Sequence, residues 1–171
     1  ANGFAAEAMG VVETAVSREP AIADRVDVVA LTGAAAYMQG HYDQAETAFN
    51  DARFDQDPAY ALWRAAVAAG RERHKVVGEF ASGGVNVPID FPMPLRAQML
   101  ISIGHSTLAS GRLEAGRAMI DNLTQMSLDP KQAAMVEYLS ALADKVEGNA
   151  DIAIDRWRAI ADAGVDRKVS V

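Results

Sequence analysis

The three histidines are the side chains best suited by type to acid–base or metal chemistry, and their spacing opposes both. His41, His74 and His105 lie far apart, and none has a second histidine three or four residues away. A zinc or di-iron site on helices needs such clustering on one helix face. The chain also has no cysteine, which excludes thiolate ligands and a cysteine nucleophile. We therefore expect no metal, no cofactor and no catalytic histidine, with His41 as a turn residue.

Acidic pairs and glycine-rich fragments do not indicate catalysis either. Glu7 with Glu13, and Asp51 with Asp55, lie in an acidic segment and are typical of solvated helix faces. The fragment "ASGG" at 81–84 lacks the strand, lysine and hydroxyl of a phosphate-binding loop. The sequence therefore favours a protein that is not an enzyme. A helical enzyme or ligand pocket beside residues 82–91 is kept as a third interpretation.

One stretch carries charge opposite to the net sign. Arg64, Arg71, Arg73 and Lys75 lie close together with a single acidic residue, Glu72. A cationic patch could hold an acidic peptide. The same charges could instead complement the dipole at a helix C-terminus. The sequence leaves both interpretations open.

Length and composition bound the class of protein. The chain has 171 residues, of which 50% are hydrophobic and 23% charged, as in a globular domain that buries its own core. The net charge is −7, with the acidic excess in residues 1–60, which opposes nucleic-acid binding. No apolar run approaches the roughly 18 residues that cross a bilayer. The compartment stays unknown, and abundant arginine and alanine hint at a bacterial source.

The elements that position these residues are predicted to be all helical. Alanine is abundant, aromatic residues are few, and the six prolines fall between apolar-periodic segments. Residues 82–91 read as a loop, while helix, loop or hinge would each fit the wider region 72–92. A further helix is expected to begin near Asp166. The other expected helices span residues 3–17, 21–39, 42–55, 59–70, 72–81, 93–109, 112–126, 131–147 and 150–163.

Small and aromatic residues recur at fixed spacing, which indicates repeated helix pairs. Gly33 is followed seven residues later by Gly40, and the same spacing recurs 71 residues on as Gly104 and Gly111. The second glycine of each pair suits a left-handed helix end, and the first lets paired helices approach closely. A plain helical bundle is the alternative. The recurring positions are Gly33, Gly40, Tyr42, Ala45, Phe49 and Ala52, then Gly104, Gly111, Leu113, Gly116, Ile120 and Leu123, then Gly148, Ala153, Trp157 and Ile160.

This pattern resembles the tetratricopeptide repeat (TPR) family over roughly residues 21–163. The match is strongest in "GAAAYMQGHYDQAETAFNDARFDQDP" (33–58), whereas the second unit keeps Trp63 but lacks a turn glycine after Arg71. The resemblance implies an α-solenoid, a superhelix of antiparallel helix pairs. It divides the chain into the second helix of a preceding pair (1–20), repeat 1 (21–58), degenerate repeat 2 with a loop (59–91), repeat 3 (92–130), repeat 4 (131–165) and the start of a further helix (166–171).

In this family the first helix of each pair lines a concave groove that holds peptides. The family's carboxylate-clamp positions carry Ala30 and Ala34 here, so a clamp for a terminal carboxylate is not expected. Glu137 and Ala141 fall at groove positions of the fourth unit. The resemblance assigns partner contacts to Asp27, Tyr37, Arg64, Arg71, Gln98, Ile101, His105 and Leu108.

The sequence therefore predicts a single TPR-like domain, part of a longer array, that acts as a non-catalytic scaffold for a protein or peptide partner. The alternative is a self-assembling or spacer domain of a larger protein that associates through the ends of the array. Exposed helix faces at such ends favour head-to-tail contacts, and a homo-oligomer is then expected.

Overall fold

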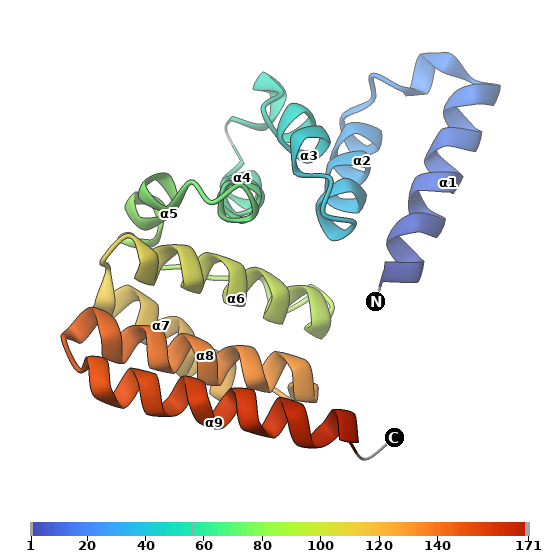
Figure 1. Cartoon of the computed structure of the whole chain (residues 1–171). Coiled ribbons are helices and arrows are strands. Elements are labelled where there is room, and N and C mark those ends of the chain that lie inside the picture. The colour runs from blue at the N-terminus through green and yellow to red at the C-terminus, as the bar shows by residue number, and fades with distance from the viewer. Residues whose placement is uncertain (1, 56, 170–171) are drawn as a thin grey trace. The chain divides into compact units, whose positions relative to one another are not determined.

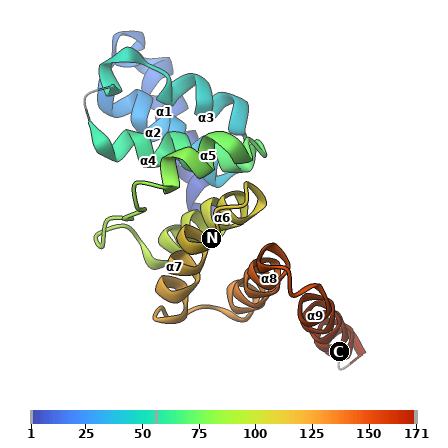
Figure 2. The ribbon, with the colours of Figure 1, turned by 90° about the vertical axis from the view of Figure 1, so that its left-hand side faces the viewer.

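The computed structural model describes residues 2–55 and 57–169, and all regular secondary structure in this part of the chain is helical. These residues contain no strand, as the composition predicted, and they divide into two compact units, 1–72 and 73–171 (Figures 1 and 2). The boundary falls inside the segment assigned to repeat 2. The first unit contains α1 (Asn2–Arg18), α2 (Val26–Met38), α3 (Tyr42–Phe49) and α4 (Pro58–Gly70). The second contains α5 (His74–Ala81), α6 (Met93–Ala109), α7 (Leu113–Thr124), α8 (Pro130–Glu147) and α9 (Ala150–Val169).

The predicted helices are confirmed, with three corrections to their bounds. The segment expected at 21–39 opens with a short 3-10 turn, Pro20–Ile22, and the α-helix begins only at Val26. The segment expected at 42–55 ends at Phe49, because Asp51 caps a separate 3-10 turn, Ala52–Phe54. The helix expected to begin near Asp166 is wrong as a separate element, since α9 continues through that residue with no proline to interrupt it. Residues 170 and 171 of that expectation lie outside the described residues.

The first unit is built on a cluster of aromatic rings. Phe49 of α3 stacks on Trp63 of α4 with centroids 5.2 Å apart, and Tyr37 of α2 meets Trp63 edge-on at 5.6 Å. Phe54 stacks on Tyr60 at 3.9 Å. Such ring pairs contribute about 0.5–1.5 kcal/mol each beyond the area they bury. They join α2, α3 and α4 into one core.

The second unit is organised around α6. This helix packs against α5, α7 and α8, and α8 packs in turn against α9 (Figure 1). Its core side chains include Met99, Ile103 and Leu139, all fully buried. Between α5 and α6 the chain forms the loop that the sequence predicted for residues 82–91, anchored by buried Val87 and exposing Ile89. Within each unit, successive helices pack against one another, while the superhelical solenoid stays a prediction.

The turns between paired helices use left-handed backbone. Gly40, Gly111 and Gly148 have φ of +79°, +82° and +102°, as their predicted role in ending helices requires. After α4, where the sequence lacks a glycine, Glu72 takes the same conformation with φ of +57°. A side chain is strained there, because its Cβ crowds the backbone.

Gly33 and Gly116 are two of the glycines at which a side chain would collide with the neighbouring helix. A Cβ on Gly33 would lie 2.9 Å from the Cβ of Ala48, and one on Gly116 would lie 2.3 Å from a methyl carbon of Leu108. Gly104 is different, since its nearest neighbours would be 3.6 Å away, an ordinary contact distance. Close approach is therefore required at Gly33 and Gly116 but not at Gly104.

Candidate functional site

Four half-buried rings form a row across the second unit, and we call it the ring row. It runs from His74 at the start of α5 to His105 of α6, Tyr138 of α8 and Trp157 of α9. Successive ring centroids are 5.7, 6.1 and 6.0 Å apart. Four helices thus place neighbouring rings at the spacing at which aromatic groups attract one another. None of the four is fully buried, so the row is partly open to a partner.

A hydrogen bond and a cation hold the two ends of the ring row. His74 Nδ1 lies 3.0 Å from the hydroxyl oxygen of Ser106, which is fully buried on α6. This bond fixes the His74 ring against its neighbour His105. At the other end the ammonium of Lys145 lies 5.9 Å from the Trp157 ring centroid, a cation–π distance. The rings are therefore held in place before any partner arrives.

Three of the four contact residues predicted in the second unit lie together on one face of α6. Gln98, Ile101 and His105 are each half-buried and follow one another at helical spacing, so they form a stripe. Leu108 continues that spacing but has no exposed surface, because it packs under Gly116 of α7. The structure thus brings three of the four predicted residues to the surface together and places Leu108 in the core.

Only His105 of the ring row was predicted as a contact residue, and Tyr138 was not singled out from the sequence. Registering the fourth unit on its turn glycine selected Glu137 and Ala141, and Ala141 is buried. Tyr138 follows His105 by 33 residues, close to one repeat length, and that spacing was the available signal. His74 was treated only as part of a basic stretch, because nothing local indicates its neighbour on α6.

In the first unit, Tyr37 and Arg64 are part of the packing. Tyr37 is only 1% exposed and lies among the rings of the core, so its side chain does not reach the surface. Arg64 of α4 donates a hydrogen bond from Nε to the carbonyl oxygen of Phe49 at 2.7 Å. It also pairs with the Asp55 carboxylate at 2.7 Å. Arg64 therefore ties α4 to the segment that follows α3.

Arg71 and Asp27 also have partners inside the first unit. Arg71 pairs with Asp43 and, at 2.7 Å, with Glu46, so the end of α4 is tied to α3. Asp27 forms a salt bridge of 2.7 Å with Arg25, and the hydrogen bonds that its carboxylate accepts from that guanidinium lower the pKa of Asp27. Partner binding by these residues stays a prediction. The structure gives the two arginines a role in packing that the spacing did not indicate.

Two features, metal-ligating clusters and membrane-spanning helices, are absent from the described parts of the chain. Among these residues no group of three or more His, Asp or Glu side chains could hold a metal ion. No helix in the same residues is long and apolar enough to cross a membrane. Under the loop after α5 lies a small cavity of about 80 Å³, lined in part by Asn86, Arg96 and Asn122. Its volume suits a few water molecules better than a metabolite.

Comparison with known proteins does not place the chain in a family. It matches no protein-family model, and searches of curated proteins and of solved structures give no significant similarity. The resemblance to tetratricopeptide repeats therefore stays a prediction that rests on the spacing of small and aromatic residues.

Proposed function

We propose that this protein is a non-catalytic, TPR-like interaction domain whose second unit binds a protein or peptide through the ring row and the adjoining stripe on α6. The observation that carries the proposal is the row itself, in which neighbouring rings come from α5, α6, α8 and α9. Aromatic side chains dominate binding energy at protein interfaces, above all when they are held rigidly beforehand.

The chemistry of this surface favours a peptide with mixed character. Ile101 and the faces of Tyr138 and Trp157 offer apolar contact, whereas Gln98 and His105 offer hydrogen bonds. Arg64 and Arg71 are left out of this binding surface, because their guanidinium groups hold α4 to neighbouring segments. The proposal thus moves the predicted site toward the second unit.

A double variant in the ring row and a control variant outside it test the proposal. We expect the wild-type protein to capture a partner from a lysate of the source cells, and His105→Ala with Tyr138→Ala to lose it. His41→Ala removes an exposed histidine at the start of α3 and should retain capture. Circular dichroism checks that each variant folds. The identified partner is then titrated against each purified protein; equal affinity for wild type and the ring-row variant contradicts the proposal.

Self-assembly is the second candidate function, and exposed apolar side chains favour it. Val11 on α1 is 68% exposed, and Ile152 on α9 is 52% exposed. Such residues on helices at the two ends of the chain suit head-to-tail association. Sedimentation velocity over a range of concentrations decides this point. A sedimentation coefficient that rises with concentration, and falls back in Val11→Lys or Ile152→Lys, supports assembly over partner binding.

A further inference from the structure

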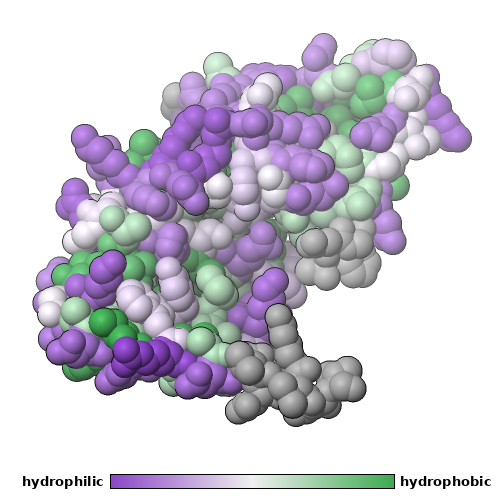
Figure 3. Space-filling model, viewed as in Figure 1, coloured by the Kyte–Doolittle hydropathy of each residue, from purple (hydrophilic) through white to green (hydrophobic). Residues whose placement is uncertain are grey.

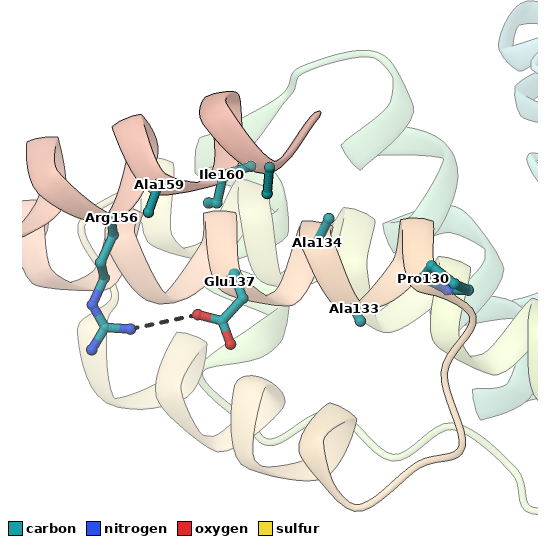
Figure 4. A pocket seen from close by; sticks show the side chains of 8 residues that line it. Pro130, Ala133, Ala134, Glu137, Arg156, Ala159 and Ile160 are labelled. Carbon is teal, nitrogen blue, oxygen red and sulfur yellow. Dashed lines mark ion pairs between the residues drawn. The ribbon is translucent and has the colours of Figure 1, made fainter. Parts of the chain in front are cut away.

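An apolar groove runs between α8 and α9 in the second unit (Figure 4). Its volume is about 450 Å³, and it is hollow because small side chains occupy most positions along it. Proline and alanine side chains from α8 line one side. The remaining apolar lining comes from Ala159, Ile160 and Ala163 of α9.

Glu137 and Arg156 lie at one end of this groove, and they are the charged residues of its lining. Arg156 forms an ion pair with Asp144, with 3.0 Å between Nε and the carboxylate, whereas its distance to the Glu137 carboxylate is 3.8 Å. The side chain of Glu137 is 63% exposed. Arg156 is thus held mainly by Asp144, and the carboxylate of Glu137 remains accessible to a second cation.

The charge and the shape of the groove both favour a helix that carries a basic side chain. Of the two carboxylates near Arg156, Glu137 lines the groove and is exposed, so this end of the groove offers a carboxylate to a cation. The groove follows α8 from Pro130 to Glu137, about two helical turns. Alanine side chains let a third helix approach at the 8–10 Å typical of close helix packing. In the space-filling view, apolar and strongly polar side chains alternate over α8 and α9 (Figure 3).

We propose that this groove binds an amphipathic helix of a partner protein, with small apolar residues on one face and a lysine or arginine that pairs with Glu137. A lysine or arginine on such a helix can pair with the exposed Glu137 carboxylate. The charged end of the groove adjoins the ring row, because Glu137 and Arg156 directly precede Tyr138 and Trp157 in the sequence. Substitutions in the groove lining and His105→Ala therefore distinguish a failure of this inference from a failure of the proposed function.

Two synthetic helical peptides of about 18 residues are the probes, each with alanine and leucine on one face. One carries lysine beside that face, and the other carries glutamate at the same positions. Fluorescence anisotropy with the whole protein should show that the lysine peptide binds at least about 10-fold more tightly. Glu137→Lys should reverse that preference. Asp121→Lys, the same charge change on α7 outside the groove, should leave it unchanged.

A groove-filling variant separates the groove from other surfaces. Ala134→Phe should abolish binding of the lysine peptide, while His105→Ala should leave it unchanged, with circular dichroism confirming the fold of both. Three results overturn the inference: no binding of either peptide, a preference for the glutamate peptide, or a preference that Glu137→Lys does not alter. Sedimentation showing a dimer that Ala134→Phe dissociates would assign the groove to a second copy and overturn it equally.

Discussion

Glycine at position 116 is a steric requirement, whereas glycine at 104 is not. An added Cβ at Gly116 would overlap the fully buried side chain of Leu108. We expect Gly116→Ala to lower the free energy of unfolding by about 1–3 kcal/mol, the usual cost of overpacking. Urea denaturation measures it.

Gly104→Ala is the matched control for that prediction. The added methyl group would meet its neighbours at 3.6 Å, and alanine is the better helix former by about 1 kcal/mol. The variant should be as stable as the wild type or more stable. Equal losses at positions 104 and 116 would show that neither glycine is a specific point of close packing.

Asp51 gives the first unit a pH dependence at the acid end. Hydrogen bonds from the Arg53 side chain and backbone N–H lower the pKa of Asp51 from 3.8 to about 2. The folded state therefore binds this proton less readily than the unfolded state. The stabilisation is fully present above the ordinary pKa of 3.8 and is lost as the pH falls toward about 2.

Asp51→Asn should remove that part of the acid sensitivity. Between about pH 4 and pH 2, the free energy of unfolding of the wild type should fall more steeply than that of the variant. Denaturant titrations at several pH values give both slopes. Asp121→Asn, which removes an exposed carboxylate on α7, should keep the wild-type slope. Parallel curves for wild type and Asp51→Asn would show that this contact does not contribute.

At the scale of the elements, the turn after α4 has a strained backbone, unlike the turns that contain Gly40, Gly111 and Gly148. Glu72 has the left-handed backbone that glycine adopts at the corresponding turns. We expect Glu72→Gly to raise the free energy of unfolding by up to about 1 kcal/mol, and Gly148→Ala to lower it by about 1 kcal/mol. Thermal denaturation compares them. The two substitutions should change the stability in opposite directions. A loss of stability in Glu72→Gly would contradict the strain at that turn.

Local signals were sufficient to predict the helices and most turns. The Asp129–Pro130 start of α8 is a complete capping box with Gln132, and its end at Gly148 is left-handed. These features depend on residues within one or two turns, so spacing reveals them. The left-handed turn at Glu72 was missed, because packing imposes it on a residue type that does not prefer it.

The candidate site was less predictable than the elements that carry it. His105 was identified through its repeat position, but its neighbours His74 and Tyr138 come from other helices. Arg71 was expected to face a partner, yet its acidic partners lie more than twenty residues earlier on α3. Contacts of that range depend on how helices pack, which composition and spacing do not specify.

For the whole molecule, the two tryptophans report on different units. Trp63 lies in the core of the first unit and Trp157 in the ring row of the second. Helical repeats stabilise mainly their neighbours, and unfolding need not be concerted along the chain. We expect the fluorescence of Trp63→Phe and Trp157→Phe variants to give different denaturation midpoints.

Far-UV circular dichroism of the same samples is the control for that experiment. It follows both units at once, so each variant should show a broad or two-step helical transition spanning both fluorescence midpoints. One sharp transition, coincident for both fluorophores and for circular dichroism, would show that the two compact units unfold as one.

The loop between α5 and α6 should tolerate insertions. Ile89 is 85% exposed at its surface, while Val87 is buried and holds one side of the loop. Lengthening an exposed loop costs little free energy, since the entropy of closure grows only logarithmically with length. A reporter domain inserted beside Ile89, or new termini opened there by circular permutation, should leave the packing of α5 against α6 intact.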